Sequence, residues 1–292
     1  MKVAVMTDSN SGITQYEAKN LGIKVVPMPF TIDGEEYLED INLTQEEFYD
    51  KLIAGANVST SQPSIAYVNS LWDELLEEFD EIVYIPMSSG LSNSCSSALT
   101  SAKNDYEGKV YVVDNQRISV TLRQSVLDAI ELAKRGFSGK EIHDKLMEMK
   151  MNSDIFIMLD TLEYLKKGGR ITPAAAALGG LLKIKPVLLI KGEKLDKFQM
   201  MNRTVANAKR IMINAVIECI QTYLKDLDGK TDNVHIEVTY SGTNLTNAND
   251  LLEQVKEAFP GKEIYFAPLS LSVSCHIGDG AIAVACSKEI LL

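Results

Sequence analysis

The sequence of 292 residues contains few of the groups that build metal centres or disulfide frameworks. Its four cysteines show no C-x-x-C spacing, and in a chain of this length we expect them to be buried thiols. Its three histidines, His143, His235 and His276, are scattered, and no pair of them has the spacing of metal ligands. We therefore expect no metal site.

Long apolar runs and basic charge are also scarce. No run approaches the roughly 20 apolar residues of a membrane-spanning helix, so we expect no integral membrane segment. The first residues lack the apolar region and cleavage site of a signal peptide, which favours a cytoplasmic protein. The formal net charge of -11 argues against a nucleic-acid partner or an anionic membrane surface, because both attract basic protein surfaces.

Nucleotide-binding signatures are missing as well. Neither G-x-x-x-x-G-K-[ST] nor G-x-G-x-x-G occurs in the chain. The glycine-rich stretch at residues 167–170 is short, and it can equally be the C-terminal cap of a helix. An enzyme that uses a nucleotide by itself is disfavoured, and we expect no cofactor.

The first half of the chain alternates apolar strands with helices. We predict strands at residues 2–6, 23–27, 82–86 and 110–114, and long helices at residues 65–79 and 117–135. This order predicts a parallel sheet covered by helices on both faces. A hairpin is expected around Asp33-Gly34, and Thr44 with Glu47 forms a capping box at a helix start.

The predicted pattern of strands and helices changes near residue 151. Further strands are predicted at residues 155–159, 184–190, 234–239, 264–267 and 281–286, with amphipathic helices at 205–223 and 246–259 and a small-residue helix from Thr172 to about 182. We therefore predict a two-domain α/β protein. Residues 1–150 form a parallel-sheet α/β/α domain, and residues 151–292 form an α/β domain with a mixed sheet.

A serine-rich turn at residues 88–92 separates a predicted strand from a predicted helix. The first N–H groups of a helix have no partner within it, so such a turn is suited to binding an anion. The alternative is that the serines only cap the helix. Ligands of parallel sheets bind beyond the carboxyl ends of the strands. The loops after residues 6, 58, 86 and 114 should then share one rim, which would gather Thr60, Ser88, Ser89 and Ser92.

Two kinds of chemistry fit these residues. Hydroxyl groups at residues 59–61 and 88–92 can hold a carboxylate without net basic charge, and His276, on a glycine-flanked loop, could add a donor. Alternatively, Gly90 to Ser94 nearly matches the G-x-S-x-G motif of a serine hydrolase. Asp114 and His276 would then complete a triad with Ser92, but spacing alone does not show that the three meet.

The motifs together resemble one family. They are residues 7–9, 60–64, 88–92, 165–171, 185–187 and 276–280, and they occur in the order seen in DegV-family proteins. These are fatty-acid-binding proteins that include the acyl-binding subunits of bacterial fatty acid kinase. The resemblance covers the whole chain.

The resemblance implies a non-enzymatic carrier with a long-chain fatty acid between two α/β domains, its tail in an apolar tunnel and its carboxylate in the cleft. By motif, Thr60 and Ser92 would contact the carboxylate, and Ser61, Ser89 and His276 would surround it. Arg170 would shape or charge the entrance. In kinase-associated members a separate kinase phosphorylates the bound acid, and Arg203 would be a candidate for docking that partner.

Three positions depart from the family pattern. Asn93 stands where glycine is usual, and Cys95 replaces an aromatic residue. Asp279 replaces a common proline, and its carboxylate would repel a carboxylate ligand if it pointed inward. We expect Asp279 to face solvent.

Overall fold

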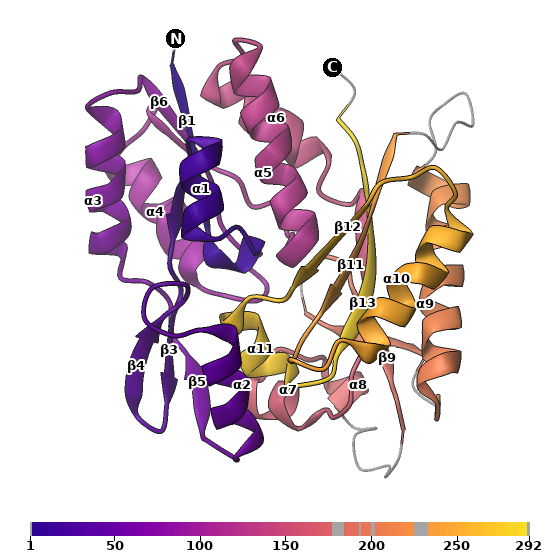
Figure 1. Ribbon diagram of the computed structural model, residues 1–292. Helices are drawn as coiled ribbons and strands as arrows, with labels where there is room; N and C mark the ends of the chain where they lie inside the picture. Colours follow the sequence, from indigo (N-terminus) through magenta and orange to yellow (C-terminus); the bar gives the residue numbers. More distant parts are fainter. Residues whose placement is uncertain (1, 177–183, 193, 200–201, 225–232, 291–292) are drawn as a thin grey trace.

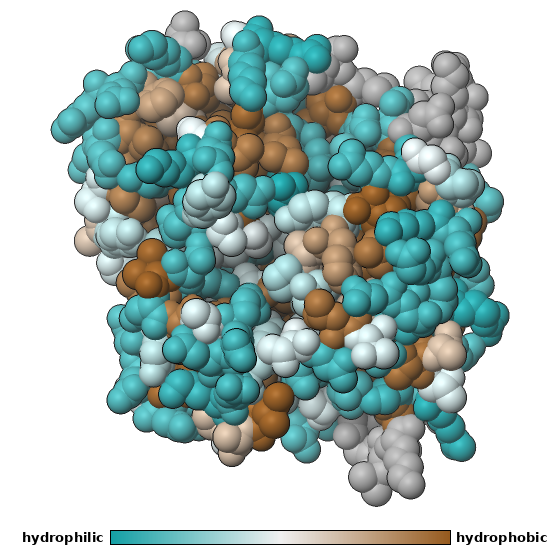
Figure 2. Space-filling model, in the orientation of Figure 1, coloured by the Kyte–Doolittle hydropathy of each residue, from teal (hydrophilic) through white to brown (hydrophobic). Residues whose placement is uncertain are grey.

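The computed structural model describes residues 2–176, 184–192, 194–199, 202–224 and 233–290. Two large sheets lie side by side, each with helices packed on it, and a small third sheet lies below the first in the view of Figure 1. The face drawn in Figure 2 is largely hydrophilic, with apolar residues in small groups between polar ones. Within the described ranges, no helix is both long enough and apolar enough to cross a membrane.

The N-terminal domain contains a fully parallel sheet, as the sequence predicts. Its strand order is β2 (Lys24–Val26), β1 (Val3–Asp8), β6 (Glu81–Ile85) and β7 (Val110–Val112). One face packs against α3 (Ile65–Leu76) and α4 (Ser94–Asp105), and the other against α5 (Ser119–Lys134) and α6 (Gly139–Glu148). Helices therefore cover both faces. A short helix, α1 (Gln15–Leu21), connects β1 to β2.

A small antiparallel sheet contains β4 (Glu35–Leu38), β3 (Pro29–Ile32) and β5 (Val58–Thr60), and α2 (Gln45–Ile53) packs on it. The predicted hairpin is present: Asp33 and Gly34 both have positive φ angles, 51° and 89°, as a two-residue turn requires. The capping box of Thr44 and Glu47 is also present. The predicted loop at residue 58 is wrong, because residues 58–60 pair with β3. Thr60 consequently belongs to the small sheet.

The C-terminal domain contains a mixed six-stranded sheet. Its order is β10 (Asp196–Gln199), β9 (Val187–Ile190), β8 (Ser153–Met158), β13 (Ile282–Lys288), β11 (Val234–Tyr240) and β12 (Ile264–Pro268). Only the β11–β12 pair is parallel among these described strands. One face carries α9 (Val205–Cys219), which continues as a π-helix over Ile220–Leu224, and α10 (Thr246–Ala258). The other face packs toward α5, so one apolar core joins the two sheets.

Three short helices lie at the end of the molecule where the sheets approach each other: α7 (Glu163–Gly168), α8 (Pro173–Ala176) and α11 (Leu271–Ile277) (Figure 1). The predicted loop around His276 is wrong, because this residue lies in the last turn of α11. Ser270 caps the start of α11, and Gly278 ends it. The predicted small-residue helix begins as α8, and its continuation beyond residue 176 lies outside the described residues.

Candidate ligand-binding site

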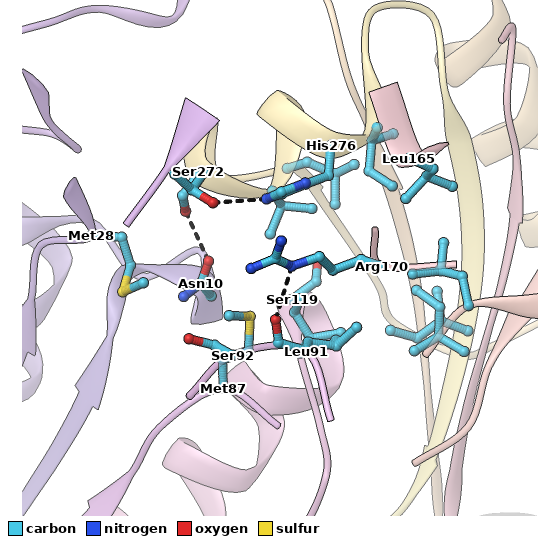
Figure 3. Close-up of a pocket in the computed structure, with 18 of the residues that line it drawn as sticks. Asn10, Met28, Met87, Leu91, Ser92, Ser119, Leu165, Arg170, Ser272 and His276 are labelled. Atoms are coloured by element: carbon cyan, nitrogen blue, oxygen red, sulfur yellow. Dashed lines mark hydrogen bonds between the residues drawn. The ribbon is translucent and has the colours of Figure 1, made fainter. Parts of the chain in front are cut away.

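A cavity lies between the two domains and takes its walls from both (Figure 3). About 200 Å³ of it is open to a water-sized molecule. One part of the wall is apolar and includes Leu91, Ile118, Ile155, Ile157, Leu165, Ile190, Leu195, Leu269, Ile277 and Ala283. The other part is polar and includes Asn10, Thr60, Ser61, Gln62, Ser92, Asn93, Ser119, Arg170, Ser272 and His276. The cavity therefore has one polar end and an apolar remainder.

Thr60 and His276 meet at the polar end. The Thr60 hydroxyl lies 2.9 Å from Nε2 of His276, which joins the end of β5 to the last turn of α11. The opposite edge of the imidazole ring faces Gly168, at the end of α7, where a Cβ atom would overlap Nδ1. Nδ1 is buried without a hydrogen-bond partner. The glycine therefore provides the space in which the ring lies.

His276 is neutral in this setting. Burial, and to a smaller extent the positive charge of Arg170, together lower the pKa of its imidazole from 6.5 to about 4. Arg170 is the one charged side chain among the described residues that line the cavity. Any formal attraction for an anion at this end of the cavity therefore comes from Arg170.

Arg170 reaches the cavity from the segment that follows α7. Its side chain extends between His276 on one side and Leu91 and Ser92 on the other (Figure 3). Nε donates to the Leu91 carbonyl oxygen at 3.3 Å, and Nη1 donates to the Gly168 carbonyl oxygen. These two bonds hold the guanidinium group at the polar end.

The serines of the turn after β6 have three different environments. The Ser88 hydroxyl, fully buried, donates to the Gly192 carbonyl oxygen at 2.9 Å and so links the two domains. The Ser89 hydroxyl donates to Asp114 at 2.7 Å, and the Ser89 N–H donates to the same carboxylate at 3.1 Å. Ser92 lines the cavity. Ser89 is not among the described residues of the cavity wall, and its contact with a ligand stays a prediction.

The hydrolase triad is not assembled. Asp114 accepts hydrogen bonds from the hydroxyl and the N–H of Ser89, and His276 is paired with Thr60. The Ser92 hydroxyl donates to the Ser94 hydroxyl at 3.0 Å and accepts the Ser94 N–H at 3.2 Å, at the start of α4. Ser92 thus bonds only to its near neighbour Ser94 among the described residues, and it lacks the hydrogen-bonded base that activates a serine nucleophile.

Several polar residues of the cavity wall were not anticipated, among them Asn10, Ser119 and Ser272. The Ser272 hydroxyl lies 2.8 Å from Oδ1 of Asn10, across the boundary between the two domains. A signal for Asn10 existed, because it lies in the polar loop after β1 that was expected on the rim. Ser272 had no such signal, because its segment was predicted to be a loop.

The remaining predicted positions lie away from the cavity. Arg203 is exposed and precedes α9. Cys95 is fully buried in the core beneath α3 and α4. Asp279 is half-buried, with its carboxylate against Gly242 instead of the cavity. The repulsion considered for Asp279 therefore does not arise at the polar end.

One group of ligand-type side chains occurs elsewhere in the described residues. Asp154, Cys219 and Cys286 are buried with their ligand atoms within 4.8 Å of one another. Lys191 pairs with Asp154 at 3.2 Å, so a cation already neutralises the carboxylate. This arrangement supplies three ligand atoms, one fewer than a structural zinc site uses.

Comparison with known proteins places nearly the whole chain in one family. A family model described as "Uncharacterised protein, DegV family" matches residues 2–289. A DegV domain-containing protein of Deinococcus radiodurans is 35% identical over 98% of both chains, and one of Staphylococcus aureus is 30% identical over 99% of both.

Solved structures are similar over their full length. A DegV family protein from Thermus thermophilus, described for its fatty acid binding, has a TM-score of 0.87 at 29% identity and covers 99% of this chain and 100% of its own. DegV from Bacillus subtilis, described as a fatty acid binding protein, has a TM-score of 0.86 at 27% identity with the same coverage. The chain therefore belongs to the DegV family.

Proposed function

We propose that this protein binds a long-chain fatty acid, with the carboxylate at the polar end of the cavity and the acyl tail along its apolar wall. The observation that carries the proposal is the division of one interdomain cavity into an arginine-bearing polar end and an apolar remainder. The fatty acid binding described for the proteins of Thermus thermophilus and Bacillus subtilis supports it. We propose a domain boundary near residue 150, between α6 and β8.

The two ends of the cavity contribute differently to binding. Burial of an acyl tail stabilises the complex by about 0.8 kcal/mol per CH₂ before the costs of association are subtracted. The tail then supplies most of the affinity. Arg170, Thr60 and Ser92 fix the orientation of the carboxylate, because charge-assisted hydrogen bonds are directional. Ser61 is exposed and also lines the cavity, where it assists in holding the carboxylate.

The Thr60–His276 pair has a defined part in this scheme. If Nε2 of the neutral imidazole carries the proton, it donates to the Thr60 oxygen and leaves the hydroxyl proton of Thr60 for the ligand. In the other tautomer Nε2 carries no proton, so the Thr60 hydroxyl would donate to Nε2 and could not donate to the ligand. We assign the Nε2–H tautomer to the liganded protein.

The same geometry favours a carrier over an enzyme. The described polar end holds donors for a carboxylate, and Ser92 has no hydrogen-bonded base. We propose that the bound acid is presented to a separate kinase, which forms the acyl phosphate. Arg203, exposed before α9, is our candidate contact for that partner.

Native mass spectrometry of protein purified from cells tests the proposal. We expect an added mass equal to that of a long-chain fatty acid, which is lost after delipidation and regained with oleic or palmitic acid. A protein that purifies without added mass and takes up neither acid would contradict the proposed function. Reaction of Ser92 with a fluorophosphonate probe would instead support the hydrolase alternative.

A further inference from the structure

Glu39, in the loop between β4 and α2, is a buried carboxylate with an unusual set of partners. It is 5% exposed and accepts the backbone N–H groups of Leu271 and Ser272, the second at 3.3 Å. It also accepts the hydroxyls of Ser272 at 2.7 Å and Ser9 at 2.9 Å. A residue of the first domain thus binds the first turn of α11, 232 residues further along the chain.

Helix α11 carries two polar residues of the cavity. Ser272 and His276 are four residues apart, so they lie on one face of the helix. Ser272 contacts Asn10 in the cavity wall as well as Glu39. The position of α11 therefore decides whether His276 reaches Thr60.

Apolar packing also holds α11. Leu271 and Cys275 lie in one buried cluster with Phe30, Phe48, Tyr49, Leu52 and other residues around the small sheet, and the Tyr49 hydroxyl lies 2.8 Å from the Ser274 hydroxyl. Such packing is non-directional, whereas the carboxylate of Glu39 fixes the first turn at two backbone positions.

We propose that Glu39 is a positioning residue of the cavity, whose carboxylate sets the register of α11 so that His276 reaches Thr60 and Ser272 reaches Asn10. The proposal rests on the proposed function for its effect on fatty acids, and on geometry alone for its effect on α11.

The chain offers a matched control for this carboxylate. Glu81 is 8% exposed and accepts the Gly139 N–H at 2.6 Å, at the start of α6, and the Tyr111 hydroxyl at 3.2 Å. It is also a buried carboxylate that binds the first turn of a helix, but it is not among the described residues of the cavity wall.

The experiment compares the full-length wild-type protein with Glu39→Ala, Glu39→Gln and Glu81→Ala, each delipidated. The first readout is the rate at which iodoacetamide labels Cys275, which lies on α11 and is 4% exposed. Peptide mass spectrometry separates this label from that of Cys95, a fully buried reference in the first domain. The second readout is the dissociation constant for oleic acid.

Loss of the carboxylate leaves two buried N–H groups unpaired, so in Glu39→Ala we expect Cys275 labelling and the oleic acid dissociation constant each to rise about tenfold. Labelling of Cys95 should stay unchanged. Glu39→Gln keeps the shape and one acceptor oxygen, and it should recover part of both effects. Glu81→Ala should change neither the rate of Cys275 labelling nor the dissociation constant for oleic acid.

Unchanged Cys275 labelling in Glu39→Ala would overturn the positioning role. An equal rise of Cys275 labelling in Glu81→Ala would overturn it too, because it would show general destabilisation. A wild-type protein that binds no oleic acid would contradict the proposed function instead. In that case, the rate of Cys275 labelling in Glu39→Ala, compared with that in the wild type, still decides the role of Glu39.

Discussion

At the scale of single residues, the polar end of the cavity depends on one hydrogen bond and one glycine. Thr60 and His276 come from positions 216 residues apart, and their bond of 2.9 Å crosses from the small sheet to α11. Gly168 provides the space for the imidazole ring. Each of these contacts can be removed separately.

Thr60→Val keeps the shape of the side chain and removes its hydroxyl. We expect the dissociation constant for oleic acid to rise about tenfold, because a hydrogen bond to a charged group contributes about 1.5–3 kcal/mol. Isothermal titration of delipidated protein measures this change. Thr31→Val is the matched control, since Thr31 lies on the adjacent strand β3 and its hydroxyl bonds to Ser59 on an exposed face. Equal loss in both variants would contradict the assignment.

Gly168→Ala introduces a methyl group where the ring of His276 lies. The backbone at this position suits alanine, so the expected loss of stability, about 1–3 kcal/mol, comes from the overlap with the ring. The double variant Gly168→Ala, His276→Ala should recover stability in urea unfolding but not fatty acid affinity. Additive losses in the double variant would show that the ring and the methyl group do not meet.

At the scale of elements, the site brings together segments that do not follow one another in the chain. The turn after β6, the end of β5, the segment after α7 and helix α11 each supply at least one polar residue. Ser88 fixes the first of these segments to the second domain through its bond to Gly192.

Ser88→Ala should lower the free energy of unfolding by about 1–3 kcal/mol, because it leaves the buried Gly192 carbonyl oxygen and the Gly90 N–H without their partner. It should also weaken oleic acid binding, since Ser92 belongs to the same turn. Ser138→Ala, which removes the N-cap of α6, is expected to cost about 1 kcal/mol of stability and leave binding unchanged. If the two variants bind equally well, the link through Ser88 does not position the turn.

The sequence predicts the elements with regular patterns better than those without. The parallel sheet, its flanking helices and the two-domain α/β class are confirmed, because apolar strands alternate with amphipathic helices. Helix α11 was missed because its apolar residues, Leu271, Val273, Cys275 and Ile277, alternate with polar ones, which is the period of a strand. Strand β10 was missed because it is short and exposed where described.

The site could be predicted only in part, because some of its contacts have no local sequence pattern. The resemblance to the DegV family brought Thr60, Ser61, Ser92, Arg170 and His276 together, and all five line one cavity. Their contacts with a carboxylate remain a prediction. The position of Ser89 and the presence of Ser272 depend on tertiary contacts, with Asp114 and with Glu39, that no local pattern reveals.

At the scale of the whole molecule, buried carboxylates lie in or near the boundary between the domains. Burial raises the pKa of Asp8 to about 6 and the pKa of both Glu39 and Glu237 to about 7. The hydrogen-bond geometry supports the raised pKa of Glu39. The Ser272 hydroxyl lies 2.7 Å from Glu39 and 2.8 Å from Oδ1 of Asn10, and its single proton can serve only one of these two acceptors. A protonated Glu39 can donate the second hydrogen bond.

These shifts predict how stability depends on pH. A carboxyl whose folded pKa is raised contributes stability that is complete below its unfolded pKa and is lost as the pH rises through its folded pKa. Between pH 8 and pH 6.5 we therefore expect the free energy of unfolding to increase on acidification, by on the order of 1 kcal/mol. Below pH 6.5 His276, whose pKa is lowered to about 4, opposes this gain because the unfolded state binds its proton more readily.

Urea unfolding of delipidated protein across this pH range measures the effect, and Glu237→Gln should reduce the slope. Glu237 is 3% exposed on β11, and its Oε2 atom has no hydrogen-bond partner among the described residues. Stability that increases from pH 6.5 to pH 8 would contradict the assignment.

The place of α11 in the chain has a consequence for synthesis of the protein. The four strands of the parallel sheet and the helices that cover it are complete by Glu148, so this part can fold while later residues are still being translated. The cavity takes Ser272 and His276 from α11 and Ala283 from β13. A nascent chain on the ribosome thus cannot form the polar end until residue 276 has emerged, so the proposed binding of a fatty acid would have to follow translation of nearly the whole sequence.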